Sequence, residues 1–371
     1  MNKIHICYLV SSLCNEGPVN VMYNIIQYID FSKFEVSIIT LIPEKKNSRL
    51  QEFKQFPIHI HQLAPNTKLS PIKLFQVLKQ KVIEINPDEL HSHCARSLYL
   101  MCFLPKKFKR VYTIHIYPGL QQQIMYGKLK GNIVIALNNF FTKRCDLPIG
   151  CAESVGELYK QYKGWNILSI PNGSSLPIWQ YNEQEKQTLK KELGLKENIK
   201  YFIFIGRFSK EKNPDILVEA FNKITSNNIG IIMLGQGPMW DELNKIKNRN
   251  IIMPGFTTRV YDYLKASDYY ISASDVEGLA NTILESMSVG LPMLLSDIPS
   301  HQEVLANIRD TQTGYIINHK NPQDIIHKIE KIINLDSNTI RNCIQNLYLQ
   351  KYTAQIMSES YQQAYIQLLK Q

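Results

Sequence analysis

The sequence contains few cysteines and no long apolar run. Its seven cysteines are scattered without a Cys-x-x-Cys pair, which excludes a disulfide framework or a zinc site and indicates a reducing compartment. No stretch approaches the roughly 20 apolar residues of a membrane-spanning helix. The first apolar run, residues 4–10, ends without a small-residue cleavage site, so it predicts a buried strand rather than a secretory signal. We therefore expect a cytoplasmic protein.

Acidic residues are scarce in the first half of the chain. Residues 1–170 carry 21 Lys and Arg against 11 Asp and Glu, whereas residues 171–371 carry 21 of each. Residues 106–110 read Lys-Lys-Phe-Lys-Arg. Such a cluster is typical of a solvated loop or of a surface that meets anionic lipid headgroups. Nucleic acid ranks last as a partner, because no nucleic-acid-binding motif accompanies the charge.

Short β-branched runs alternate with helical patterns along all 371 residues. Strands are expected at 4–10, 36–42, 58–62, 89–91, 110–115, 147–149, 167–170, 201–205, 229–234, 251–253, 269–272 and 292–296. Helices are expected at 19–29, 71–85, 214–225, 239–247, 260–266, 281–289, 322–335 and 354–369. This alternation favours βαβ units and parallel sheets, and the length suits two domains.

Turn-forming residues divide the pattern in two. The segment 171–177 holds two prolines, a glycine and two serines, which is linker chemistry. We predict an α/β protein of two doubly wound, Rossmann-like domains, residues 1–171 and 172–353. A final amphipathic helix, residues 354–371, is expected to pack back on the first domain. Parallel sheets bind ligands at the carboxyl ends of their strands, so an active site is expected in a cleft between the domains.

Two cations follow the predicted strand at 201–205. Gly206 ends this strand, a short loop holds Arg207 and Lys212, and Pro214 opens a helix. Arg offers a planar fork to phosphate oxygens, and Lys acts as a movable point charge. Paired cations at the edge of a sheet would stabilise a diphosphate leaving group. Without their position after a buried strand, they would be taken as solvated loop charges.

Two carboxylates surround a glycine after the predicted strand at 269–272. Glu277 and Gly278 precede a predicted helix, and Glu285 lies about two turns into it. The N–H groups at the start of such a helix form an anion site, and the carboxylates can accept hydrogen bonds from two sugar rings. A single Glu before a helix is usually a cap or a partner of the helix dipole, but a pair at this spacing favours a binding role.

A third candidate motif is the glycine-rich turn Gly235-Gln-Gly-Pro, which alone is weak evidence for a ligand site. The full dinucleotide fingerprint Gly-x-Gly-x-x-Gly is absent here and after the first strand, which disfavours a dehydrogenase.

Taken in order, these motifs resemble the family 4 retaining glycosyltransferases of the GT-B fold. The similarity runs through the second half of the chain on Gly206-Arg207…Glu211-Lys212, Leu234-Gly-Gln-Gly-Pro, Pro254-Gly255-Phe256, Glu277-Gly278…Glu285, Gly290-Leu-Pro and Glu303. In the first half, residues 90–93 and 112–115 resemble the family's His-containing strand ends, and residues 171–173 its interdomain hinge.

The resemblance implies a role for each matched residue. Donor-binding residues would be Gly17, Gly206, Arg207, Lys212, Gly255, Phe256, Glu277, Gly278, Leu279, Ala280, Asn281 and Glu285. Catalysis would rest on His115, Arg207, Lys212 and Glu277, with no metal and no other cofactor. His91 and His93 are interpreted as structural. Where the family often has Gly-Gly, this chain has Glu16-Gly17, so Glu16 must point away from the diphosphate or serve the acceptor.

We therefore predict transfer of a sugar from a UDP- or GDP-linked donor to a saccharide or lipid-linked saccharide, with retention of anomeric configuration, in bacterial surface polysaccharide synthesis. Partners would be the donor, the acceptor and an anionic membrane surface met by the basic first domain, with peripheral attachment at the inner face of the cytoplasmic membrane. Three alternatives stay open: a sugar-nucleotide epimerase, a phosphorylase, for which no distinctive pyridoxal phosphate lysine is found, or a non-catalytic nucleotide-sugar-binding module.

Overall fold

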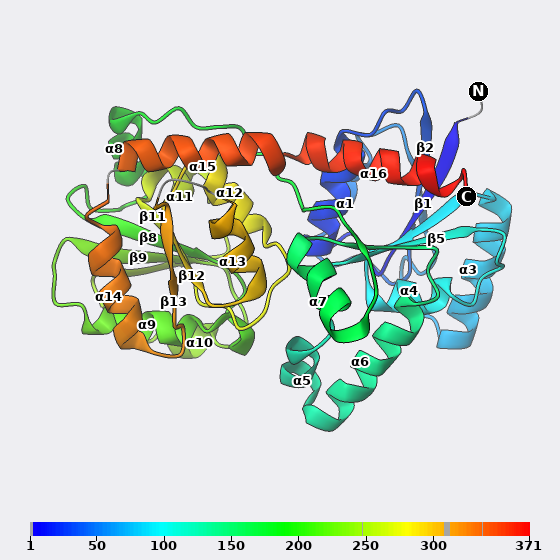
Figure 1. The fold of residues 1–371 in the computed structure, drawn as a ribbon, viewed down its shortest axis with the longest axis horizontal. Coiled ribbons are helices and arrows are strands. Elements are labelled where there is room, and N and C mark those ends of the chain that lie inside the picture. Colours follow the sequence, from blue (N-terminus) through cyan, green and yellow to red (C-terminus); the bar gives the residue numbers. More distant parts are fainter. Residues whose placement is uncertain (1–2, 247, 308–311, 336) are drawn as a thin grey trace. The chain divides into compact units, whose positions relative to one another are not determined.

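The computed structural model describes residues 3–246, 248–307, 312–335 and 337–371. The chain forms two compact units (Figure 1). Unit 1 comprises residues 1–175 and 353–371, and unit 2 comprises residues 176–352. Both are parallel α/β structures, as the alternating pattern predicts. No helix among the described residues is both long enough and apolar enough to cross a bilayer.

Unit 1 is built on a seven-stranded parallel sheet in the order β3-β2-β1-β4-β5-β6-β7. Its strands are β1 Ile4–Val10, β2 Phe34–Thr40, β3 His59–Gln62, β4 Glu89–Ser92, β5 Lys109–Ile114, β6 Leu147–Gly150 and β7 Leu168–Ser169. Its helices are α1 Gly17–Gln27, α2 Leu50–Phe53, α3 Pro71–Ile85, α4 Ala95–Met101, α5 Leu120–Tyr126, α6 Lys128–Thr142, α7 Glu153–Lys163 and α16 Ala354–Leu368.

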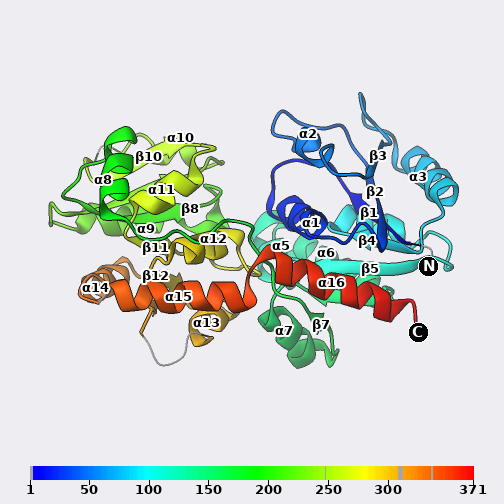
Figure 2. The ribbon, with the colours of Figure 1, turned by 90° about the horizontal axis from the view of Figure 1, so that it is seen from above.

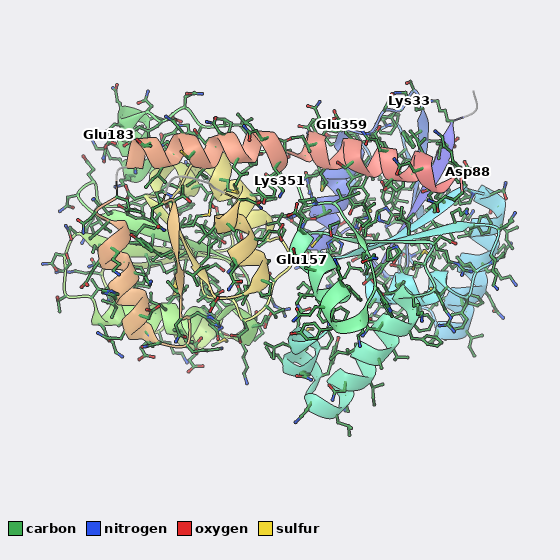
Figure 3. The ribbon with its side chains drawn as sticks, in the orientation of Figure 1. Lys33, Asp88, Glu157, Glu183, Lys351 and Glu359 are labelled. Atoms are coloured by element: carbon green, nitrogen blue, oxygen red, sulfur yellow. The ribbon has the colours of Figure 1, made fainter. Side chains whose placement is uncertain are left out.

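The sheet of unit 1 is buried on both faces because alternate side chains of β1 enter different cores. Ile6 and Tyr8 join one apolar cluster, whereas Cys7 and Leu9 join another. Charged side chains such as Lys33 and Glu359 lie on the outside (Figure 3). A parallel sheet covered by helices on both faces requires such continuous apolar strands.

The last helix, α16, completes the core of unit 1. It packs against α1 (Figure 2), and Tyr361 and Tyr365 on it are fully buried. The Tyr365 hydroxyl lies 3.0 Å from the Tyr8 hydroxyl and 2.7 Å from His91 Nδ1. The chain enters α16 beside the point where it leaves unit 1, because Ser174 pairs with Thr353.

Unit 2 is built on a six-stranded parallel sheet in the order β10-β9-β8-β11-β12-β13. Its strands are β8 Lys200–Ile205, β9 Ile229–Leu234, β10 Ile251–Gly255, β11 Tyr269–Ser272, β12 Met293–Ser296 and β13 Gly314–Ile317. Its helices are α8 Glu183–Glu192, the 3-10 turn Lys210–Lys212, α9 Pro214–Lys223, α10 Trp240–Leu243, α11 Val260–Ala266, α12 Asn281–Val289, α13 Pro299–Ala306, α14 Pro322–Ile332 and α15 Ser337–Lys351.

Proline opens several of these helices, as its fixed φ and missing N–H group favour. Asn321 caps α14 through a bond from the Gln323 N–H group, and Gly290 ends α12 in the left-handed conformation. The strand at Gly314–Ile317 is an addition to the expected elements.

The basic segment 106–110 differs from the expected exposed cluster. Phe108 is buried in the core, and Arg110 is also buried, with its guanidinium donating to the Leu104 carbonyl at 2.8 Å. Lys109 begins β5. The four cations therefore do not form one solvent-exposed surface, because the strand turns Arg110 inward.

We expect the substitution Tyr365→Phe to destabilise the protein. It leaves the buried Tyr8 hydroxyl and His91 Nδ1 without the shared partner, which costs about 1–3 kcal/mol. Urea unfolding measures the loss. The control Tyr162→Phe removes a hydroxyl from an exposed ring and should change little. An equal effect of both substitutions would contradict the network's contribution.

Candidate functional site

The predicted donor residues of unit 2 come together at the carboxyl edge of its sheet. Strands β8 and β11 are neighbours, and their parallel pairing brings the loops that follow them side by side. The Asp275 N–H group donates to the Glu211 carbonyl at 2.8 Å, and Asn213 Nδ2 donates to the Ala273 carbonyl at 2.9 Å. These two bonds hold the cation-bearing loop against the carboxylate-bearing loop.

At this junction Lys212 forms an ion pair with Glu277. The Glu277 side chain is nine-tenths buried and that of Lys212 about three-quarters buried. The Ser274 hydroxyl donates to the same Glu277 oxygen at 2.8 Å. The two charges that the sequence suggested separately therefore neutralise each other in the structure. A partly buried pair of this kind is screened much less than a surface pair.

Asp275, on the same loop, has three partners. Asn213 and His319 hydrogen bond to its Oδ1 at 2.9 and 2.8 Å, and Lys320 pairs with it. Burial alone would raise the pKa of Asp275, but these partners lower it to about 2. Asp275 is therefore charged at neutral pH and holds the loop in place. Sequence reasoning missed His319 and Lys320, which lie 44 and 45 residues further along the chain without a motif.

The loop before α12 is also held from its other side. The Ser296 hydroxyl donates to the Ser274 carbonyl at 2.6 Å, and His301 Nδ1 lies 2.9 Å from that hydroxyl. The Ser300 hydroxyl donates to the Glu277 carbonyl at 3.3 Å. Burial lowers the pKa of His301 to about 4, so it is neutral here. These bonds keep the Glu277 backbone fixed at the sheet edge.

The N-terminus of α12 lies directly after the carboxylate-bearing loop. Its first residues follow Gly278 and Leu279, and the N-cap Ala280 makes no side-chain cap bond. Asn281 Oδ1 is buried without a hydrogen-bond partner among the described residues. Eight residues beyond Glu277, Glu285 lies on the same helix, and burial raises the pKa of its carboxyl to about 7.

Two glycines allow the loops after β8 and β9 to interlock. A Cβ atom on Gly235 would lie 1.9 Å from the Gly206 carbonyl oxygen, and one on Gly237 would lie 2.4 Å from the Phe208 carbonyl oxygen. The Phe208 N–H group donates to the Gln236 carbonyl at 3.0 Å. The glycine-rich turn thus fixes the backbone that leads into Arg207.

The remaining predicted donor residues of unit 2 lie at the same edge. Arg207 is exposed directly after Gly206. Gly255 ends β10 with a φ of +88°, and the ring of Phe256 beside it is 61% exposed. An exposed aromatic ring at a strand end is a surface on which a planar base can stack.

In unit 1 the rings of the three predicted histidines lie side by side at the carboxyl ends of β4 and β5, tilted by 39° and 37° from one to the next. His91 is fully buried with both ring nitrogens bonded, to Tyr365 and Thr113, which matches its structural interpretation. His93 Nδ1 lies 3.2 Å from His115 Nε2. Burial lowers the pKa of His115 to about 4, so the ring is a neutral hydrogen-bonding group.

Gly17 starts α1 after the first strand, with no atom near the place of a Cβ. Glu16 at the N-cap lies 3.8 Å from Lys45, and both side chains are exposed.

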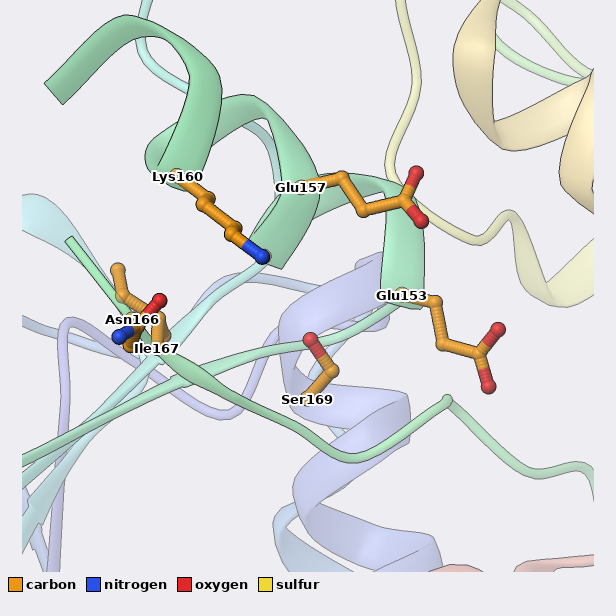
Figure 4. A pocket seen from close by; sticks show the side chains of 7 residues that line it. Glu153, Glu157, Lys160, Asn166, Ile167 and Ser169 are labelled. Carbon is orange, nitrogen blue, oxygen red and sulfur yellow. The ribbon is translucent and has the colours of Figure 1, made fainter. Parts of the chain in front are cut away.

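A separate hollow of about 290 Å³ lies between α7 and β7, lined in part by Glu153, Glu157, Lys160 and Ser169 (Figure 4). None of the predicted site residues lines it.

The described part of the chain contains no group of three or more His, Cys, Asp or Glu side chains that could hold a metal ion. That the reaction needs no metal stays a prediction.

Comparison with known proteins identifies the family and the fold of the chain. Residues 185–350 match the family model described as glycosyl transferases group 1, and residues 16–176 match that of glycosyltransferase family 4. The solved structure of HepE from Anabaena in complex with UDP-glucose shares the fold, with a TM-score of 0.79 at 16% identity over 97% of this chain and 99% of that one.

Two curated relatives cover most of the chain. One is the UDP-Gal:alpha-D-GlcNAc-diphosphoundecaprenol alpha-1,3-galactosyltransferase of Escherichia coli, 26% identical over 75% of this chain and 74% of the relative. The other is the alpha-monoglucosyldiacylglycerol synthase of Acholeplasma laidlawii, 26% identical over 84% of each chain. The fold and these matches define a glycosyltransferase of the GT-B class. The chain belongs to glycosyltransferase family 4.

We expect Gly235→Ala to destabilise unit 2. Its φ of +129° is strained for alanine, and the new methyl group would overlap the Gly206 carbonyl, together costing about 3 kcal/mol or more. Chemical denaturation measures the loss. Gly17→Ala is the matched control, because its Cβ meets nothing within 4 Å. A Gly235→Ala protein as stable as the control would show that the loops can separate.

We also expect Glu285→Gln to stabilise the protein above neutral pH. Burial raises the pKa of Glu285 from 4.5 to about 7. Between these values the folded chain keeps a proton that the unfolded chain has lost, so stability falls as the pH rises and the loss is complete above about pH 7. Glutamine does not titrate, so it removes this dependence on pH. The free energy of unfolding should then rise by at most roughly 3 kcal/mol at about pH 8.

Melting temperatures of both proteins from about pH 5 to pH 8 test this sign. The difference should grow with pH. Glu330→Gln, which neutralises an exposed carboxylate on α14, should show no such trend. A constant difference across the range would contradict the buried carboxyl.

Proposed function

We propose that the chain transfers a sugar from a UDP- or GDP-linked donor to an acceptor hydroxyl, with retention at the anomeric carbon. The observation that carries the proposal is the ion pair of Lys212 with Glu277 beside the N-terminus of α12. It brings a cation, a carboxylate and a helix N-terminus together at one edge of one sheet, which supports binding of a diphosphate and a sugar there. The name of the Escherichia coli relative, which contains UDP-Gal, favours a UDP-linked donor.

The ion pair suggests how the site accepts its donor. Before binding, Lys212 and Glu277 satisfy each other and avoid an uncompensated buried charge. A bound diphosphate would take over Lys212, and the freed Glu277 carboxylate would accept hydrogen bonds from the sugar hydroxyls. The exposed Arg207 fork would hold a second phosphate oxygen. Amides of Gly278, Leu279 and Ala280 and the side chain of Asn281 would complete the anion site.

In the chemical step, the bond between the anomeric carbon and the terminal phosphate oxygen breaks as the acceptor oxygen bonds to that carbon. The acceptor proton passes to a leaving diphosphate oxygen on the same face of the sugar, which accounts for retention. Arg207, Lys212 and the helix N-terminus stabilise the charge that develops on the diphosphate. Glu285 would bind the ribose hydroxyls. Neutral His115 would hydrogen bond to the reacting sugar.

The acceptor is proposed to be a saccharide or lipid-linked saccharide of bacterial surface polysaccharide synthesis. Both curated relatives carry a lipid in their names, as a diphosphoundecaprenol acceptor or as a diacylglycerol product. The excess of cations in residues 1–170 suits an acceptor with a phosphate or an acidic membrane around it. With such an acceptor, the enzyme would act at the inner face of the cytoplasmic membrane.

We expect Arg207→Ala and Lys212→Ala each to lower kcat by about a hundredfold or more, because each removes a contact to the leaving diphosphate. A screen of sugar nucleotides by thermal shift first identifies the donor, which should raise the Tm. Lys210→Ala is the matched control, since Lys210 is an exposed cation in the same short turn. Full turnover in both variants would contradict the assignment. Conversion of the donor sugar without acceptor would indicate an epimerase instead.

A further inference from the structure

Helices α5 and α6 of unit 1 expose an apolar face. On α6 the exposed apolar side chains are Leu129, Ile133, Leu137 and Phe140, at spacings of three or four residues that align them on one side. Their exposed fractions range from 40% to 79%. The neighbouring α5 adds Leu120, Met125 and Tyr126, each about half exposed. We call this set the α5–α6 face.

The pattern of α6 is the reverse of an ordinary surface helix. Its buried side includes the polar residues Asn138, Asn139 and Thr142 beside Phe141, whereas four large apolar side chains lie on its solvent side. The Tyr99 hydroxyl donates to Asn138 Oδ1 at 2.5 Å, and Phe141 packs against the Tyr99 ring. These inner contacts fix the rotation of the helix, so that its apolar side points outward. Soluble proteins rarely leave such a continuous patch uncovered.

The two helices present this face together. They pack against each other (Figure 1), and Gly131 makes the contact close. A Cβ atom there would lie 2.7 Å from the Gln122 carbonyl oxygen and from the Gln123 Cα atom. The face therefore has a defined shape rather than the mobility of a loop.

Cations border the face at both ends of α6. Lys128 and Lys130 begin the helix, and Lys143 and Arg144 follow it, all exposed. The Arg144 guanidinium lies 3.4 Å from the centre of the Phe140 ring. Between Glu89 and Asp146 the sequence has nine Lys and Arg and no acidic residue. Apolar residues bordered by cations are the composition of helices that lie in the interface of an anionic bilayer.

This charge selects the partner. A second copy meeting the same face would bring together two helix pairs that carry cations and no acidic residue, which costs free energy. An anionic lipid surface instead supplies opposite charge for the lysines and an apolar layer for the leucines. We infer that the α5–α6 face docks this protein on an anionic lipid bilayer. The inference rests on the proposed lipid-linked acceptor. It names the α5–α6 face as the surface of the protein that contacts the membrane holding that acceptor.

The test is sedimentation of the full chain with vesicles of phosphatidylcholine alone or mixed equally with phosphatidylglycerol. The protein should bind the mixed vesicles. The triple variant Leu129→Gln, Ile133→Gln and Leu137→Gln should bind the mixed vesicles at least about tenfold more weakly than the unchanged protein. Lys128→Gln with Lys130→Gln should weaken binding about fivefold for each cation and reduce its salt dependence.

Two control variants keep the face intact. Ile72→Gln removes an apolar side chain of α3 that is 75% exposed, and Lys106→Gln with Lys107→Gln removes two exposed cations of the same unit. Both should bind like the unchanged protein. Equal binding by the triple variant, or loss in the controls alone, would overturn the inference. So would a dimer in vesicle-free solution that the triple substitution dissociates.

Melting temperature and the thermal shift with the sugar nucleotide are measured on every variant. An unchanged shift with lost vesicle binding isolates the docking face from the donor site. If no sugar nucleotide binds yet the vesicle results hold, the proposed function fails while the docking face stands. If the donor binds and turns over but no protein sediments with mixed vesicles, the docking inference alone is wrong.

Discussion

The candidate donor site depends on a backbone-to-backbone contact that only glycine permits. Gly235 lies against the carbonyl of Gly206, and hydrogen bonds on either side lock the loop after β9 to the loop after β8. Asn213 and Asp275 then join the loop after β8 to the one after β11. Three strand ends are thus held as one rigid edge, and charged side chains on such an edge keep their positions at little entropic cost.

The same edge concentrates charges that water would otherwise solvate. Lys212 and Glu277 neutralise each other, Asp275 is held charged by three partners, and Glu285 is buried far enough to raise its pKa to about 7. Of these, the Glu285 carboxyl lowers the stability of the unliganded protein as the pH rises toward 7, whereas the partners of Asp275 favour its charged form in the folded chain. In the proposed function, a donor with a diphosphate and two hydroxyl-rich rings would supply new partners for Lys212, Glu277 and Glu285 when it binds.

Much of the fold follows from local chemistry in the sequence. The strand Tyr269–Ser272 and the helix Asn281–Val289 have the bounds expected from the apolar pattern. Helix α6 was not among the expected helices. Its apolar residues lie on both sides, with Phe141 buried and Leu129 and Ile133 exposed, so they do not mark one buried face. Lys212 and Glu277 were found from the motifs, but their pairing was not, since it depends on the adjacency of β8 and β11. His319 and Lys320 lie on a loop without a motif, and only tertiary structure places them at Asp275. The donor roles of these residues stay predictions.

The place of α16 in unit 1 has a consequence for synthesis of the protein. Unit 2 is a continuous segment, whereas unit 1 needs Tyr361 and Tyr365 of α16 to close the core around Tyr8 and His91. While the ribosome is still making α16, the first 175 residues lack part of their interior and leave apolar surface open. Domains generally fold in the order of their synthesis. Here the segment made second can fold first, and the unit that begins the chain is completed last.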